Sequence, residues 1–499
     1  MDVADLGRLL AASPAEPFVR TMARLADDDP DFVAISHEDD TITRRELELR
    51  SNRLARVFTA KGVGFGDYVA IALPNGVAWY VTFFATLKVG AVPLPLSYRL
   101  PSSERQAILE LADAALVVGV EDGSHRGYAS LPAGFVPDGS VSDDPLPEVV
   151  SPSWKAPTSG GSTGRPKIIR AGTPAEASPV INQFVFGYTP EDTQAVIAPL
   201  YHNSALGTSI GGLLLGQHLV VMNKFAAEET LRLIEKHRIT WLMLVPTMMH
   251  RMYRVLEEGG SYDLSSIRLL LHMASKCPEW LKEKWIELLG PEAILEFYGG
   301  TESVAITAIT GTEWLEHRGS VGRPFVGDMK VLGSDGVELP PGEVGEIYMK
   351  GADGMGPAYE YVGAEAKVVD GWETLGDLGW KDEDGYLYIS DRRVDMIVSG
   401  GANVYPAEVE AAIDQHPSVL SSVVVGLPDD DLGARVHAIV QAQSGTAEED
   451  LLGFLADKLV RYKIPRSIEF IDEPLRDDSG KVRRSQMRDQ AIERMKSLA

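Results

Sequence analysis

Short apolar runs alternate with amphipathic helical segments along most of the chain. Residues 68–73 read YVAIAL, which is typical of a buried strand, and residues 43–61 before them have helical periodicity. Strands separated by helices favour βα units and a largely parallel sheet. The rhythm continues in four further apolar runs, at residues 195–200, 219–222, 241–245 and 267–273. The pattern therefore predicts an α/β fold.

Chain length adds a second domain. The 499 residues exceed the limit of about 250–300 at which one hydrophobic core stops growing. Beyond the charged segment at residues 381–385 the pattern becomes a compact mixture, with a helix that begins near Pro406 and strand-like runs at residues 422–426 and 467–472. We therefore expect a large N-terminal domain of mixed and parallel sheets with flanking helices, residues 1–392, and a small α+β C-terminal domain, residues 393–499.

Charge and composition narrow the range of partners. The 47 basic and 72 acidic residues give a formal net charge of −25, which argues against nucleic acid or an anionic lipid surface as a general partner. The single cysteine, Cys277, rules out an intramolecular disulfide and a multi-thiolate metal site, and it fits a reducing, cytoplasmic compartment. The N-terminus lacks the basic start of a signal peptide, and charged, Gly and Pro residues interrupt the apolar stretch at 78–94, so no membrane span is expected.

The segment TSGGSTGRPK, residues 158–167, has the composition of an anion-binding loop. Glycines let backbone N–H groups approach an anion, while hydroxyl groups and a lysine add donors and charge. It differs from the Walker loop because Arg165 and Pro166 follow the last glycine. By itself such a run is equally typical of a flexible surface loop. The candidate ligand-binding residues are Thr158, Ser159, Gly160, Gly161, Ser162, Thr163, Gly164 and Lys167.

Later segments carry residues that suit a nucleotide. Residues 298–302, YGGTE, combine an aromatic ring that can stack on a purine, a hydroxyl group and a carboxylate for Mg²⁺. Asp377 and Arg392 can hydrogen-bond the two hydroxyls of a ribose. Lys481 lies on a glycine-preceded turn near the C-terminus. Each of these is also typical of an ordinary turn or a solvated surface, so the order of the set is what indicates a function.

In this order and at these separations, the segments resemble the adenylate-forming superfamily of acyl-CoA synthetases, peptide-synthetase adenylation domains and luciferases. The resemblance covers nearly the whole chain. It implies that the large domain binds ATP and a carboxylic acid, and that the C-terminal domain is a mobile lid that pivots at Arg393, Val394 or Asp395. The implied enzyme converts acid and ATP to an acyl-adenylate and pyrophosphate, then transfers the acyl group to coenzyme A with release of AMP.

The resemblance also implies roles at the phosphate end of the site. Residues 158–167 would hold the β- and γ-phosphates, and Thr158 and Glu302 would be Mg²⁺ ligands. Thr301 would contact the α-phosphate, while Lys481 would bridge the acid and the α-phosphate in the first half-reaction. Positioning and cations aimed at the developing charge suit a reaction that brings one anion onto another.

The nucleoside and coenzyme A ends follow in the same way. The resemblance implies that Tyr298 and Gly299 contact adenine and that Asp377 and Arg392 fix the ribose. For the second half-reaction, a gating histidine would separate the pantetheine channel from the acyl pocket, and two glycines would leave room for the pantetheine arm. Those residues are His202, Gly400 and Gly401.

The chain departs from the family pattern in several places. Gly161 stands where Thr is common, Ile168 where Gly is usual and Leu375 where Arg is usual. Residues 272–280 replace a familiar glycine-rich strand end, and Val394 takes a position often held by a charged hinge residue. None of these changes removes a predicted catalytic residue.

The predicted acid is hydrophobic. The segments expected to line its pocket are mostly apolar or small, and they contain no Asp to meet a substrate amine: residues 202–209, 241–248, 273–275 and 298–307. Fatty, aryl and steroid or bile-acid-like acids all fit this composition. The sequence leaves the oligomeric state open, a homodimer included.

The sequence leaves three other functions to consider. Residues 207–211, GTSIG, match the nucleophile elbow of a serine esterase, but the residues before Ser209 make a poor strand and no oxyanion motif appears. Transfer of the acyl group to a carrier protein keeps the fold, although no fused carrier domain is expected. A nucleotide-binding protein without catalysis is opposed by the presence of Glu302 and Lys481.

Overall fold

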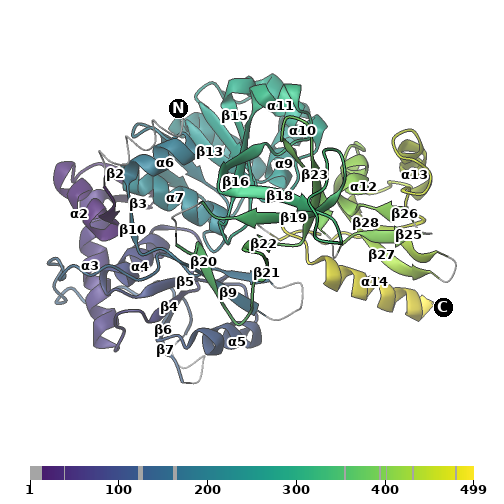
Figure 1. Ribbon diagram of the computed structural model, residues 1–499. Helices are drawn as coiled ribbons and strands as arrows, with labels where there is room; N and C mark the ends of the chain where they lie inside the picture. Colours follow the sequence, from purple (N-terminus) through teal and green to yellow (C-terminus); the bar gives the residue numbers. More distant parts are fainter. Residues whose placement is uncertain are drawn as a thin grey trace.

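The computed structural model describes residues 14–38, 40–121, 127–160, 166–352, 356–392, 395–399, 402–429, 432–477 and 480–498. Figure 1 shows a large body of sheets and helices, with a smaller group of elements from the C-terminal part of the chain at one side. This arrangement confirms the predicted fold class, a large α/β domain followed by a smaller α+β domain. Within the described ranges, none of the helices is long and apolar enough to cross a membrane.

The longest sheet has the strand order β17-β16-β15-β14-β13-β11-β12-β2-β3. The strands from β15 to β2 in that order are parallel, and the strands outside them pair antiparallel. Parallel sheets are covered on both faces, so their strands read as continuous apolar runs. Their bounds are Val33–His37 (β2), Asp40–Thr43 (β3), Thr193–Val196 (β11), His218–Val221 (β12), Trp241–Leu244 (β13), Leu269–His272 (β14), Ile294–Gly299 (β15), Ile306–Thr310 (β16) and Arg323–Val326 (β17).

Smaller sheets complete the large domain. Strands Val92–Pro95 (β5), Tyr68–Ile71 (β4), Leu116–Val118 (β6) and Ala129–Leu131 (β7) form a parallel sheet in that order. An antiparallel sheet joins Tyr359–Val362 (β20), Pro166–Ala171 (β9) and Thr158–Gly160 (β8). Another contains Asp328–Leu332 (β18), Gly345–Lys350 (β19), Lys367–Val369 (β21), Trp372–Thr374 (β22), Asp377–Lys381 (β23) and Leu387–Arg392 (β24). The short strands Glu16–Pro17 (β1) and Glu176–Ala177 (β10) pair with each other.

Helices pack on these sheets. Helix Arg44–Ala60 (α3) begins with a capping box in which Thr43 and Glu46 satisfy each other's backbone N–H groups. Helix Val77–Lys88 (α4), which lies in the apolar stretch at 78–94, is buried nearly all round. The others are Phe18–Asp28 (α2), Ser102–Ala112 (α5), Pro179–Phe186 (α6), Asn203–Leu215 (α7), Ala227–His237 (α8), Pro246–Glu257 (α9), Glu279–Leu289 (α10), Gly311–Glu316 (α11) and the 3₁₀ turn Pro291–Ala293.

The C-terminal domain has its own core. Strands Val419–Asp429 (β27) and Gly433–Ala442 (β28) are antiparallel, and Ser467–Phe470 (β29) adds parallel to β28. Ile397–Ser399 (β25) and Ala402–Val404 (β26) pair as a hairpin. Helices Pro406–Ile413 (α12), Glu448–Ala456 (α13) and Arg484–Leu498 (α14) pack around these strands. The predicted boundary between residues 392 and 393 stays a prediction.

The two domains meet through polar contacts. Arg254 of α9 donates hydrogen bonds to the backbone carbonyls of Pro417 (2.5 Å) and Val419 (2.8 Å). Arg483 pairs with Glu104 of α5 at 3.2 Å, and both side chains are exposed. None of the buried apolar clusters in the described residues includes side chains of both domains.

One predicted strand is wrong in part. The apolar run at 195–200 was expected to be a strand along its whole length, but β11 ends at Val196. The reason is a distant side chain: Asn75 donates to the carbonyl of Ala198 (3.0 Å) and accepts from the N–H of Leu200 (2.9 Å). These bonds hold the segment as a connection that leads into α7.

Candidate active site

The glycine-rich segment lies between two paired strands. In the β8–β9 ladder, Thr158 is opposite Ile168 and Gly160 is opposite Pro166. The ladder therefore brings together the two ends of the predicted phosphate loop. Four predicted residues lie outside the described residues: Gly161, Ser162, Thr163 and Gly164. Ser159 and Gly160 are described by their backbone alone.

Lys167 and Glu302 form an ion pair in the structure. The Lys167 ammonium lies 3.4 Å from a carboxylate oxygen of Glu302, and Glu302 is buried. The hydroxyl of Tyr361, from β20, donates to the same oxygen at 2.5 Å, and the Lys167 ammonium lies 3.9 Å from the centre of the Tyr361 ring. Burial raises the pKa of Tyr361, and the neighbouring Glu302 carboxylate raises it further, so this hydroxyl keeps its proton and acts as a donor.

The donor set fits Mg²⁺ bound together with phosphates. The described residues contain no cluster of three or more His, Cys, Asp or Glu side chains that could hold a metal alone. Mg²⁺ in nucleotide sites typically takes one or two carboxylates and completes its shell with phosphate oxygens and water. Glu302 supplies one carboxylate, and Thr158 begins the strand that leads into the glycine-rich segment.

The predicted adenine and ribose residues also come together. Tyr298, near the end of β15, donates from its hydroxyl to the carboxylate of Asp377 at 2.8 Å. Asp377 begins β23 and pairs in register with Arg392 at the end of β24. The strand β15 and the strand pair β23–β24 are far apart in sequence, and together they bring the backbones of Tyr298, Asp377 and Arg392 to one site. Gly299 is opposite Ile306 in the β15–β16 pair.

His202 occupies the position just before the first residue of α7. Its backbone is extended, its side chain makes no capping hydrogen bond, and its ring lies 4.5 Å from that of Tyr201. Burial lowers the pKa of His202 to about 3, and the charge of Lys481 lowers it as well, while Asp477 opposes the shift. His202 is therefore neutral at pH 7. Lys481 of the C-terminal domain is therefore near enough for its charge to act on His202.

Lys481 lies on a tight turn. Its N–H donates to the carboxylate of Asp477 at 3.0 Å, and the N–H of Asp477 donates to the carbonyl of Lys481 at 3.0 Å. Gly480 has φ = +77°, a conformation that favours glycine. A Cβ atom on Gly480 would lie 2.5 Å from Oγ1 of Thr247, in the first turn of α9. The turn is therefore docked directly on the large domain.

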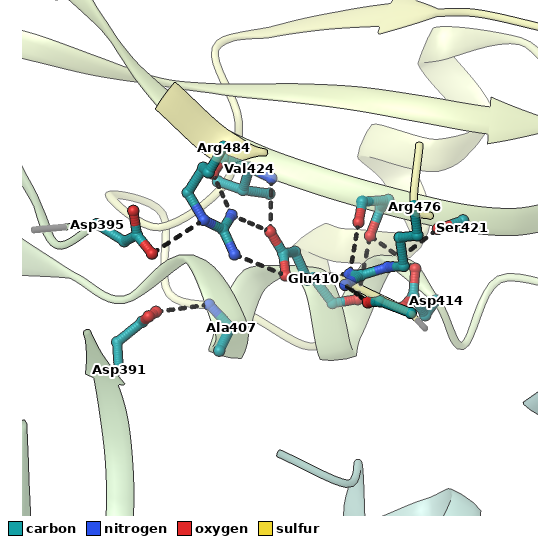
Figure 2. A network of polar contacts seen from close by, with 11 residues as sticks. Asp391, Asp395, Ala407, Glu410, Asp414, Ser421, Val424, Arg476 and Arg484 are labelled. Atoms are coloured by element: carbon teal, nitrogen blue, oxygen red, sulfur yellow. Dashed lines mark hydrogen bonds and ion pairs between the residues drawn. The ribbon is translucent and has the colours of Figure 1, made fainter. Parts of the chain in front are cut away.

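A buried polar network holds the two ends of this turn (Figure 2). Glu410 of α12 is buried and binds the guanidinium groups of both Arg476 and Arg484. Arg476 also donates to the carbonyl of Gly480 at 3.3 Å, and Arg484 donates to the carbonyl of Val424 at 2.7 Å. Since arginine presents several donors in a fixed fork, the network fixes the segment that carries Lys481 to the core of its domain.

The same network reaches the predicted hinge. Figure 2 shows Arg484 beside Asp395, with its Nε 3.4 Å from the carboxylate, and Asp391 accepting a hydrogen bond from the N–H of Ala407 at 2.9 Å. Arg393 and Val394 lie outside the described residues, as do Gly400 and Gly401. The choice among the three hinge residues and the role of the two glycines stay predictions.

The esterase alternative fails on local structure. Residues 207–211 lie inside α7 rather than between a strand and a helix, and Ser209 is fully buried with its hydroxyl near the carbonyl of Leu206. A nucleophile elbow needs an exposed serine on a sharp strand-to-helix turn. Cys277 is buried too, and burial raises the pKa of its thiol, as expected for a structural cysteine.

Sequence reasoning missed some residues of this region. Tyr361, Glu410 and Arg476 were given no role from the sequence, and tertiary contacts bring them to this region. Lys155 offered one signal, a lysine immediately before the apolar Ala156 and Pro157 and the glycine-rich run. In the structure Lys155 is buried, and its ammonium donates to the side-chain oxygen of Asn203.

Comparison with known proteins identifies the family. Residues 22–359 match the AMP-binding enzyme family, and residues 408–481 match the AMP-binding enzyme C-terminal domain. The chain belongs to the AMP-binding enzyme family. The resemblance seen in the motifs, to adenylate-forming enzymes of the acyl-CoA ligase branch, is confirmed.

Relatives of this family cover almost the whole chain. A feruloyl-CoA synthase of an Amycolatopsis species is 34% identical over 92% of this chain and 96% of its own length. A fatty acid–[acyl-carrier-protein] ligase, ScoC of Streptomyces coeruleorubidus, is 32% identical over 95% of this chain and 96% of its own. The solved o-succinylbenzoate CoA synthetase of Bacillus subtilis, in complex with its acyl-adenylate intermediate, has a TM-score of 0.82 and 28% identity over 95% of this chain and 98% of its own.

These likenesses confirm the enzyme class, an AMP-forming acid–CoA ligase. They also confirm the expected ATP, Mg²⁺ and coenzyme A, since the Bacillus subtilis synthetase has been solved with ATP and a magnesium ion and the relatives are named for coenzyme A. A bile acid appears in none of these relatives' names, and a fatty acid appears in the name of the acyl-carrier-protein ligase alone among them, so the fatty-acid and bile-acid predictions are not confirmed.

Proposed function

We propose that this chain activates a hydrophobic carboxylic acid, foremost an aryl acid, as its acyl-adenylate and then transfers the acyl group to coenzyme A. The observation that supports this most is the docking of the turn that carries Lys481 on the large domain, where a Cβ on the neighbouring Gly480 would lie 2.5 Å from Oγ1 of Thr247. The acid and the α-phosphate are both anionic, so a cation brought between them lowers the barrier to their reaction.

In the first half-reaction, a carboxylate oxygen forms a bond to the α-phosphorus of ATP while the bond from that phosphorus to pyrophosphate breaks. Tyr298 and Asp377, joined by their hydrogen bond, would orient the nucleoside, and Thr301 would contact the α-phosphate. Lys481 would bridge the attacking oxygen and the α-phosphate. Bound Mg²⁺, held by Glu302 with Thr158, would supply charge neutralisation at the phosphates.

In the second half-reaction, the sulfur of coenzyme A forms a bond to the acyl carbon, the bond from that carbon to the AMP oxygen breaks, and the thiol proton passes to solvent. The C-terminal domain would turn about Arg393, Val394 or Asp395 and bring Gly400 and Gly401 to the pantetheine arm. His202 would gate the arm's entry; because its ring is neutral, it adds no charge beside the thioester.

The substrate class rests on the walls of the expected pocket. Its segments reach the carboxyl ends of the neighbouring strands β11, β13, β14 and β15, where open parallel sheets bind their ligands, and the segment 241–248 includes the whole of β13. They contain buried Met243, Val245 and Met248, and their only acidic residue is Glu302. An aryl acid fits both this apolar composition and the feruloyl and o-succinylbenzoate relatives.

A carrier protein is the second candidate acceptor, because one relative is named as a ligase for an acyl-carrier protein. The two acceptors differ in what must bind beside the pantetheine arm: free coenzyme A has a nucleotide, while a carrier protein has a folded surface. Supplying each acceptor to the same acyl-adenylate decides between them. Location in the cytoplasm and a homodimer stay predictions.

The test is acid- and coenzyme A-dependent release of AMP, measured with benzoate, ferulate, decanoate, palmitate and cholate. We expect an aryl acid to give the highest kcat/KM. Lys481→Ala should lower adenylate formation by about 100-fold or more, because it removes one charge-stabilising donor, yet largely spare thioester formation from supplied acyl-adenylate. A flat response to every acid would refute the ligase proposal, and equal losses in both half-reactions would refute the role of Lys481.

A further inference from the structure

Three lysines are buried in the described structure, and one of them lacks an acidic partner. Lys88 lies 2.5 Å from Glu48, and Lys282 lies 2.6 Å from Glu296. Lys155 is only 5% exposed, and among the described residues its ammonium hydrogen-bonds an amide oxygen but no carboxylate. A buried cation is costly unless it is paired, so the environment of Lys155 is incomplete in a way that those of the other two are not.

Lys155 is held rigidly. Its carbonyl accepts hydrogen bonds from the N–H of Ala171 in β9 and from the hydroxyl of Ser153, both at 2.9 Å. Its ammonium lies 4.6 Å from the centre of the Trp154 ring and donates to Oδ1 of Asn203. The side chain therefore has a defined position that does not depend on the C-terminal domain.

That position is next to other residues of the candidate site. Asn203 is the first residue of α7, next to His202, where the charge of Lys481 is felt. Burial lowers the pKa of Lys155 to about 7, and the charge of Glu302 opposes this shift. Lys155 thus contacts the start of α7, and the charge of the carboxylate predicted to hold Mg²⁺ acts on it. The first turn of α7 adds backbone N–H groups and the positive end of the helix dipole.

We propose that Lys155 is a fixed binding cation for the carboxylate of the acid substrate and then for the acyl-phosphate group of the adenylate. The proposal rests on the proposed function and adds a second cation to it. The anionic substrate completes the charge pair that the protein leaves open, and it favours the charged form of the lysine.

Lys155 and Lys481 should then differ in their effects. Lys481 belongs to the domain that turns away, so it acts in adenylate formation. Lys155 belongs to the large domain and stays beside the reacting group, so it acts in both half-reactions. In the second, it would offset the negative charge that develops on the carbonyl oxygen as the thiol attacks.

The experiment compares Lys155→Met with Lys88→Met, a matched buried lysine that does have a carboxylate partner and lies outside the site. Thermal unfolding of the ligand-free protein, the KM for the best acid of the panel and the rates of both half-reactions are measured. Lys155→Met should keep or raise the melting temperature while kcat/KM for the acid falls about 100-fold and both half-reactions slow. Lys88→Met should lower the melting temperature and leave the KM unchanged.

Lys155→Gln, which retains a polar end but no charge, serves if the methionine variant does not fold, and it should show the same loss in both half-reactions. A lowered melting temperature with an unchanged KM would overturn the proposal and leave Lys155 a structural residue. Loss of adenylate formation alone would also overturn it. If wild-type protein releases no AMP with any acid, the proposed function fails first; if wild type is active and Lys155→Met equals it, only the role of Lys155 fails.

Discussion

Gly480→Ala tests whether the observed docking of the C-terminal domain is the arrangement that forms the adenylate. The new Cβ would lie 2.5 Å from Oγ1 of Thr247 and 3.2 Å from Cγ2 of Val245. Ordinary contacts of this kind begin near 3.4 Å, so the turn or Thr247 must move by roughly 1 Å. Overpacking of this size typically costs about 1–3 kcal/mol. The docked arrangement should therefore be about 5- to 150-fold less populated.

Alanine also introduces backbone strain at φ = +77°, of about 1–2 kcal/mol, but that strain acts in every orientation of the domain. Gly445→Ala is the matched control: its φ is +91° and a Cβ there would meet nothing within 4 Å. It should lower the stability of the domain without a preference for either half-reaction.

The assay is acid-dependent exchange of pyrophosphate into ATP for the first half-reaction, and thioester formation from supplied acyl-adenylate for the second. Gly480→Ala should lose the first and retain the second, and Thr247→Ala in the same chain should recover part of the loss by removing the clashing oxygen. Equal loss in both half-reactions, or the same pattern in Gly445→Ala, would refute the reasoning.

Two predictions concern stability. Lys282→Ala leaves the buried carboxylate of Glu296, in the strand that carries Tyr298, without its cation. The free energy of unfolding measured by urea titration should therefore fall by about 3–5 kcal/mol. Lys284→Ala, which removes an exposed ion pair, is the control and should change the free energy of unfolding little. Burial lowers the pKa of His250 to about 4, below the unfolded value near 6.5, so the unfolded state takes up the proton first and stability is lost as pH falls below about 6.5. Between pH 7 and pH 5 the loss in the free energy of unfolding that comes from His250 is about 2 kcal/mol, and His250→Gln should reduce the pH dependence by that amount. Parallel curves for wild type and variant would contradict the assignment.

The sequence predicts well what depends on periodicity and local order. The helix at residues 43–61 and the strands at 68–73 and 241–245 follow from apolar spacing and capping, and they are found as α3, β4 and β13. The strand at 195–200 is overestimated because a distant amide takes over its backbone hydrogen bonds, and no local pattern encodes such a bond.

The site shows the same division. Thr158, Tyr298, Glu302 and Asp377 are recognisable because short motifs fix them relative to one another. The partners that set their electrostatics are not, because each comes from elsewhere in the chain: Tyr361 reaches Glu302 across 59 residues, and Lys155 reaches Asn203 across 48. Those separations become contacts only once the sheets have formed.

The polar contacts between the two domains affect how much free energy a domain rotation costs. The cross-domain hydrogen bonds and ion pair named above come from Arg254, Asp391 and Arg483, and none of the apolar clusters in the described residues is shared by the two domains. Water can replace such polar contacts at little cost in free energy. Because the described parts of the two domains share no apolar cluster, rotation of one domain against the other exposes little apolar surface. The free-energy difference between domain orientations in the ligand-free protein is then small. The bound reaction intermediate can therefore decide which orientation is populated, and turnover needs no separate energy source for the movement.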